Sequence, residues 1–202
     1  MAVGAVFFDI GETLVDETAA WEAVADAAGV PRLTLLGLLG GTAALREDHR
    51  RAFDLLGLEA PPWPGYGHDD FYPDALPCLR ALKAAGYVVG LAGNQPQAVE
   101  PFLAASGVEV DVIASSASWR VSKPAPRFFE RVVAEAGLPA GQVAYVGDRL
   151  DNDVLPAAAA GLVAVFLRRG PWGFLHAEWP EVERAHLRLE SLAELPEALA
   201  RV

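Results

Sequence analysis

The chain has 202 residues, of which 52% are hydrophobic and 21% are charged, and its formal net charge is -11. This composition supports a globular domain with a buried core, with or without a small insert, and excludes a disordered chain. The acidic excess argues against nucleic acid or a membrane surface as a partner, and no apolar run reaches the roughly 20 residues of a membrane span. A single cysteine excludes a disulfide framework, and the N-terminus does not resemble a signal peptide, so we expect a cytoplasmic protein.

The first element in the chain is an apolar run over residues 3–9, which predicts a buried strand ending in Asp9. Residues 17–57 are rich in Ala, Leu and Glu and predict two or three helices, with breaks at Gly29-Val30-Pro31 and at Gly40-Gly41. Residues 58–72 are dense in Pro, Gly and aromatic side chains, which is typical of an ordered linker.

Beyond the linker the chain alternates between helix and strand, and glycines end most of the expected helices. Helices are predicted over residues 73–85, 96–106, 126–136, 154–160 and 191–201, and strands over 87–92, 110–114, 143–146 and 162–167. This order predicts an α/β fold: a three-layer, Rossmann-like parallel sheet of about five strands with right-handed crossovers. We expect residues 1–14 and 73–202 to form this core and residues 15–72 to form a helical domain inserted after the first strand.

Four loops are expected along one edge of the sheet, because each follows or closely trails the carboxyl end of a strand. They cover residues 9–13, 93–94, 122–124 and 147–153. Together they carry carboxylates, one lysine, an amide and several glycines. A carboxylate can attack phosphorus, Mg²⁺ prefers hard oxygen ligands, and a lysine can neutralise charge on a transferring phosphoryl group. The loops therefore indicate phosphoryl chemistry.

The order of these motifs resembles the haloacid dehalogenase-like superfamily of aspartate-nucleophile phosphohydrolases. The residues that carry the resemblance are Asp9 and Thr13 in the first motif, Asn94 in the second, Lys123-Pro124 in the third, and Gly147-Asp148 with Asp153 in the fourth. The resemblance extends over residues 3–170, and the helical insert looks like the cap of the family's class I members.

The resemblance implies an enzyme that hydrolyses a small phosphorylated molecule with Mg²⁺ as cofactor. Asp9 would be the nucleophile and a metal ligand, the backbone carbonyl of Gly11 a second ligand, and Asp148 the main carboxylate ligand of the last motif. The remaining implied roles belong to Asp153 as a further carboxylate at the metal, to Lys123 as the link between nucleophile and phosphate, and to Gly93 and Asn94 as phosphate-binding residues.

Two positions depart from the family pattern. Gly11 stands where the family has a second aspartate that acts as general acid and base, and Gly93 stands where it has Ser or Thr. A positioned acid contributes about 10²–10⁴-fold to the rate, so turnover of alkyl phosphate esters is expected to be weak. Glu12 is the nearest spare carboxylate that could replace the missing acid.

Two alternative functions stay open at the level of sequence. The first is a catalytically impaired protein that keeps the pocket for binding or regulation, which the two glycines favour. The second is a 2-haloacid dehalogenase, since dehalogenases also lack the second aspartate.

The aromatic-rich segment 171–180, which contains His176, is expected to pack on the core or to form a dimer contact. A monomer and a homodimer are both compatible with the sequence.

Overall fold

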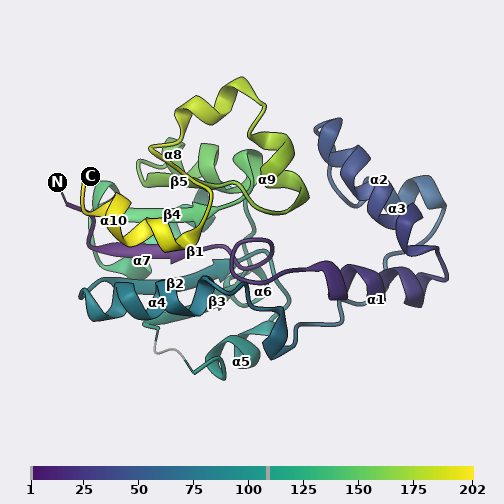
Figure 1. The fold of residues 1–202 in the computed structure, drawn as a ribbon, viewed down its shortest axis with the longest axis horizontal. Helices are drawn as coiled ribbons and strands as arrows, with labels where there is room; N and C mark the ends of the chain where they lie inside the picture. The colour runs from purple at the N-terminus through teal and green to yellow at the C-terminus, as the bar shows by residue number, and fades with distance from the viewer. Residues whose placement is uncertain (1, 108–109) are drawn as a thin grey trace. The chain divides into compact units, whose positions relative to one another are not determined.

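The computed structural model of the chain describes residues 2–107 and 110–202. The chain forms two compact units, shown in Figure 1. The larger unit combines Met1–Asp16 with Gly67–Val202, and the smaller unit is Glu17–Tyr66.

The larger unit is built on a parallel sheet, which has six strands within the described residues, in the order β3-β2-β1-β4-β5-β6. The strands are β1 (Ala5–Phe8), β2 (Val88–Gly93), β3 (Val112–Ser115), β4 (Val143–Gly147), β5 (Val163–Leu167) and β6 (Leu187–Leu189). The predicted α/β fold and parallel sheet are confirmed. The sixth strand was not predicted, because β6 has three residues with an exposed Arg188 at its centre and gives no apolar run.

Helices connect these strands. They are α4 (Ala75–Ala84), α5 (Val99–Ala104), α6 (Ser116–Trp119), α7 (Pro126–Ala136), α8 (Leu155–Ala159), α9 (Gly170–His176) and α10 (Leu195–Leu199). Shorter turns are η1 (His68–Asp70), η2 (Ala140–Gln142), η3 (Leu150–Val154), η4 (Pro180–Arg184) and η5 (Leu192–Glu194). Helix α9 was not predicted, because its Pro171 and Gly173 resemble loop residues, although proline is well tolerated in the first helical turn.

The core lies on both faces of the sheet, since side chains alternate along each strand. Phe7 of β1 and Tyr145 of β4 pack against Phe128 and Phe129 of α7 in one buried cluster. On the sheet's other side α4 contacts β2 and also contacts α10, which completes three layers (Figure 1). In the register Phe7 lies beside Gly90, where an added Cβ would fall 2.2 Å from the Phe7 ring. Glycine at that position lets the aromatic ring cross the neighbouring strand.

The smaller unit is fully described and contains three helices, α1 (Thr18–Ala28), α2 (Arg32–Ala44) and α3 (Arg51–Leu56). The predicted break at Gly40-Gly41 is wrong, because α2 continues through both glycines. Leu35, Leu39 and Ala43 recur at helical spacing on its buried side, and this packing holds the helix together despite its glycines.

Within residues 2–107 and 110–202, no single helix is long and apolar enough to cross a membrane. Helices α1 and α2 are long and apolar enough only when they are taken together, and the pair is bent by 116° at the break between them.

Candidate active site

The candidate site lies where three neighbouring strands end. β1 is at the middle of the sheet between β2 and β4, so the residues that follow these strands meet at one edge. Asp9 follows β1 directly, and its backbone N–H donates to the Val146 carbonyl of β4 at 2.9 Å. Asp148 follows β4 directly, and Asp153 lies within the short turn η3 that leads into α8. The fold therefore brings the predicted carboxylates to one place.

Lys123 joins two of these carboxylates. Its Nζ lies 2.7 Å from Asp9 Oδ1 and 2.6 Å from Asp153 Oδ1, and its side chain is 1% exposed. Burial opposes the charge of Lys123, but the carboxylates of Asp153 and Asp9 outweigh burial and raise the lysine pKa well above its usual value. Lys123 is therefore a permanent cation beside Asp9.

Asn94 fixes the backbone of Lys123. The Lys123 N–H donates to Asn94 Oδ1 at 2.8 Å, and Asn94 Nδ2 donates to the Lys123 carbonyl at 3.0 Å. Both polar atoms of the amide are thus engaged with the lysine backbone. Asn94 lies after β2, so this pair of hydrogen bonds aligns the loop that carries Lys123 with the edge of the sheet.

Asp9, Asp148 and Asp153 form a buried acidic cluster whose ligand oxygens all lie within 4.8 Å of one another. Burial first, and then the charges of Asp153 and Asp9, raises the pKa of Asp148 well above its usual value. Burial raises the pKa of Asp153 to about 7, although Lys123 acts in the opposite direction. Asp148 Oδ2 is buried and has no hydrogen-bond partner among the described residues. One lysine leaves the negative charge of three carboxylates partly uncompensated, so the donor set fits a divalent cation that prefers oxygen ligands.

Glycines at the ends of two strands make room for these carboxylates. A Cβ added at Gly93, the last residue of β2, would lie 2.5 Å from Asp9 Oδ1. A Cβ added at Gly147, the last residue of β4, would lie 2.4 Å from Asp153 Cγ. Glycine at position 93 therefore does more than remove the hydroxyl of the family's Ser or Thr. Because it has no side chain, the Asp9 carboxylate can lie beside Lys123.

Gly11 and Glu12 lie in the turn that follows Asp9. Gly11 pairs with Val15 in an isolated bridge, and Glu12 has a positive φ of 51°, which is unusual for a residue with a side chain. The Glu12 carboxylate is buried and accepts a hydrogen bond from Tyr72 Oη at 2.7 Å. A Cβ at Gly170 would lie 2.4 Å from Glu12 Oε2, so glycine is needed at that position too. The Glu12 side chain is thus held by the hydrogen bond from Tyr72 in the space that Gly170 leaves for it.

Arg169 supports this turn from the loop after β5. It donates to the Thr13 carbonyl at 2.8 Å and to Asp74 Oδ2, and its guanidinium lies 4.2 Å from the centre of the Tyr72 ring. Asp74 Oδ2 also accepts from Ser191 Oγ at 2.6 Å and from the Leu192 N–H at 3.0 Å. The loop after Asp9 is therefore tied to the C-terminal part of the chain.

Several supporting residues carry no recognisable signal in the sequence. Tyr145 Oη donates to the Ala92 carbonyl at 2.7 Å, and its ring lies below Lys123 Nζ at 5.6 Å from the ring centre. His176 Nδ1 accepts from the Leu150 N–H at 2.9 Å, inside the segment expected to pack on the core or form a dimer contact. Both are buried contacts between distant parts of the chain, which one-dimensional spacing does not reveal.

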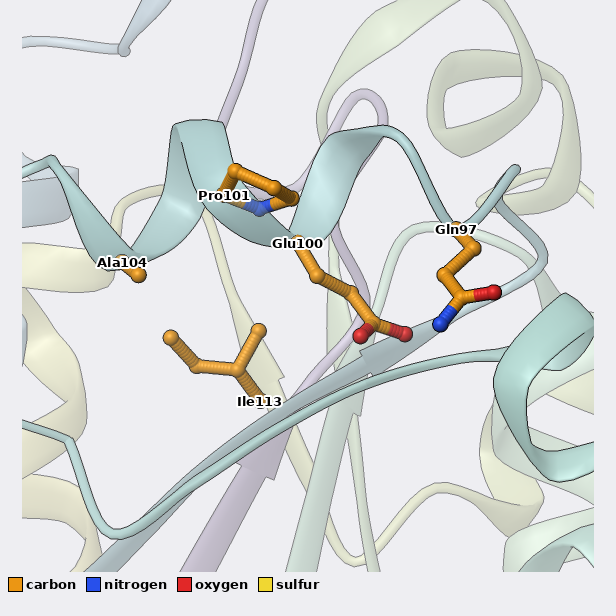
Figure 2. Close-up of a pocket in the computed structure, with 5 residues that line it drawn as sticks. All are labelled: Gln97, Glu100, Pro101, Ala104 and Ile113. Atoms are coloured by element: carbon orange, nitrogen blue, oxygen red, sulfur yellow. The ribbon is translucent and has the colours of Figure 1, made fainter.

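A separate pocket of about 310 Å³ lies against α5 and β3 and is lined by Gln97, Glu100, Pro101, Ala104 and Ile113. Figure 2 shows the Gln97 amide beside the Glu100 carboxylate, with Ile113 on the strand side. Its lining, within the described residues, includes none of the acidic cluster, so we do not assign this pocket to the candidate site.

The parallel sheet places the chain in the α/β class, with acidic residues and a lysine at its carboxyl edge. The chain belongs to the haloacid dehalogenase-like hydrolase family, whose model matches residues 3–161. The family predicted from the order of the motifs is therefore confirmed.

Individual relatives carry different activities in their names. The chain is 33% identical over 145 residues to glyceraldehyde 3-phosphate phosphatase of Methanopyrus kandleri, a match that spans 62% of each chain. It is 30% identical over 165 residues to (S)-2-haloacid dehalogenase 4A of Burkholderia cepacia, spanning 79% of this chain and 68% of that one. A solved HAD phosphatase from Thermococcus onnurineus has a TM-score of 0.66 at 23% identity, covering 98% of both chains, which shows the shared fold.

Asp74→Asn is expected to lower the free energy of unfolding by about 2 kcal/mol at pH 7, because the variant loses charge-assisted hydrogen bonds. Burial alone would raise the pKa of Asp74, but hydrogen bonds from Arg169 and Ser191 outweigh it and lower the pKa. A lowered native pKa gives stability that is present above the unfolded pKa of about 3.9 and is lost as pH falls through the native pKa.

Urea unfolding of both proteins from pH 3 to pH 7 measures this effect. The difference between them should hold from about pH 5 to pH 7 and shrink below about pH 4. The exposed Asp69→Asn is the matched control and should change stability little across the range. A difference that persists undiminished at the acid end contradicts the assignment.

Proposed function

We propose that the chain is a Mg²⁺-dependent phosphohydrolase in which Asp9 attacks the phosphorus of a small phosphorylated molecule. The observation that carries the proposal is the buried line Asp9–Lys123–Asp153, with Asp148 beside it. A carboxylate held by a permanent cation at a strand end is placed for nucleophilic attack, and the uncompensated acidic cluster supplies ligands for a metal. The phosphatase relatives favour the same reaction class.

In this proposal Asp9, Asp148, Asp153 and the backbone carbonyl of Gly11 hold the Mg²⁺ ion. The bound metal supplies charge neutralisation, which lets an anionic phosphate approach the anionic nucleophile. Residues 17–66 are proposed to be the family's cap.

Hydrolysis then proceeds in two steps, in which Asp9, Lys123 and Asn94 have different roles. An Asp9 oxygen forms a bond to phosphorus while the bond from phosphorus to the leaving oxygen breaks, and the leaving group carries off that electron pair. Lys123 neutralises charge on the phosphoryl oxygens, and Asn94 acts through the lysine backbone that it holds. Water next attacks phosphorus, which releases inorganic phosphate and regenerates the Asp9 carboxylate.

A second candidate function is dehalogenation of a 2-haloacid. The observation in its favour is the similarity to haloacid dehalogenase 4A, which extends over 79% of this chain. The acidic cluster weighs against it, because displacement of a halide by one carboxylate leaves Asp148 and Asp153 without a task. A third candidate, a binding protein without turnover, rests on Gly11 and Gly93.

Phosphate release with Mg²⁺, compared with EDTA, tests the proposed function. Acetyl phosphate and p-nitrophenyl phosphate are expected to be hydrolysed only with the metal, and Asp9→Asn should lower turnover roughly 10⁴-fold or more, because the nucleophile is lost. Asp111→Asn, which breaks a surface ion pair with Lys83, is the matched control and should retain full activity.

Chloride release from 2-chloropropionate is measured in parallel. Chloride release without phosphate release from any phosphate would favour the dehalogenase. Mg²⁺ binding by a folded protein without either reaction would favour the binding protein.

A dependence on the leaving group is expected because residue 11 has no acid to protonate a departing oxygen. Acyl and aryl phosphates leave without a proton, so they should be hydrolysed faster than alkyl esters such as sugar phosphates. Gly11→Asp supplies the missing acid and should raise turnover of alkyl esters by about 10²-fold relative to acetyl phosphate.

The same substrate series run with Glu12→Gln serves as the comparison. If Glu12→Gln selectively abolishes alkyl ester hydrolysis, Glu12 already acts as the acid and the assignment of the deficit to position 11 is wrong. Equal rates for all leaving groups in the unmodified enzyme would also contradict it.

A further inference from the structure

His176 is a buried histidine outside the segment that the family model covers. It ends α9, is 1% exposed, and lies beyond residue 161, where the family match stops. Its Nδ1 accepts a hydrogen bond from the Leu150 N–H at 2.9 Å. An imidazole that accepts at Nδ1 is neutral and carries its proton on Nε2.

The hydrogen bond reaches the turn that carries the acidic cluster. Leu150 begins η3, two residues after Asp148 and three before Asp153. The first N–H groups of a helical turn have no acceptor within the turn and need one from outside. Here the Arg149 N–H donates to Asp153 Oδ2 at 3.0 Å, and the next N–H donates to His176. Adjacent N–H groups thus fix the Asp153 side chain and tie the turn to α9.

The ring of His176 is itself held in place. The Trp179 ring packs on it with a centroid distance of 3.9 Å, and the Trp179 N–H donates to the His176 carbonyl at 3.0 Å. Leu150 is fully buried. The contacts between His176 and Trp179 therefore hold His176 Nδ1 in position to accept the hydrogen bond from the turn.

We propose that His176 is a positioning residue for the metal-binding carboxylates: it holds the η3 turn so that Asp148 and Asp153 face Asp9. This rests on the proposed function of that cluster. Asp153 contacts both the turn and Lys123, so a shift of the turn would be transmitted to the lysine and to the nucleophile. Outer residues that orient metal ligands typically change metal affinity by about 10–100-fold when they are lost.

A packing role and a positioning role predict different results in three variants. His176→Phe keeps an aromatic ring but removes the acceptor. His176→Asn places an amide oxygen near the position of Nδ1 and restores an acceptor. Val182→Ala removes packing from the buried cluster that contains Leu150 and leaves His176 and its Trp179 neighbour in place.

The experiment measures the Mg²⁺ dissociation constant by titration calorimetry on the full chain and, without metal, the exchange rate of the Leu150 amide by NMR. His176→Phe is expected to raise the dissociation constant about tenfold and to speed exchange at Leu150. His176→Asn should recover much of both. Val182→Ala should lower the melting temperature while the dissociation constant stays near the unmodified value.

An unchanged Mg²⁺ affinity in folded His176→Phe overturns the proposal, and so does an equal loss of affinity in Val182→Ala. Failure of the proposed metal site looks different, because the unmodified chain itself would then bind no Mg²⁺, whereas a chain that binds Mg²⁺ without turnover still tests the role of His176. In that case the Leu150 amide decides the remaining point: exchange that does not change in His176→Phe shows that the histidine does not hold the turn.

Discussion

The structure depends on burying three carboxylates around one ammonium group. Removing charges from water is costly unless each is paired or hydrogen-bonded. The contacts of Lys123 to Asp9 and Asp153 offset this cost. One oxygen of Asp148 has no hydrogen-bond partner among the described residues. Burial first, and then the charges of neighbouring carboxylates, raises the pKa values of Asp148 and Asp153. Much of the surrounding architecture serves to hold these groups together.

That architecture uses backbone as much as side chains. Gly93 and Gly147 end the two strands that flank β1, and they leave the space that Asp9 and Asp153 occupy. Asn94 aligns the lysine loop through both of its amide atoms. In our account the turn after β4 is held by His176 from a segment that follows the last strand of the predicted sheet. The site is therefore assembled from both ends of the chain and from its middle.

The parts of this picture that could be predicted from the sequence are those with a local pattern. Apolar runs ending in Asp9 or in Gly147-Asp148 predict both the strands and the edge at which they meet. The space at Gly93 could not be predicted, since a glycine in a motif looks like a missing hydroxyl until the Asp9 side chain is placed beside it. Helix α2 passes through glycines that look like a break, because its spaced leucines are buried within its own unit. His176 depends on a contact between residues 26 positions apart, which no local pattern encodes.

We propose that Asp9 carries the phosphoryl group between the two steps of hydrolysis. The most direct test is rapid acid quenching of the enzyme during turnover of acetyl phosphate with Mg²⁺, followed by digestion at low pH and mass spectrometry of the Asp9 peptide. The account predicts that this peptide carries one added phosphoryl group, which is absent with EDTA. Phosphate release at a steady rate with the phosphoryl group found on another residue would contradict it.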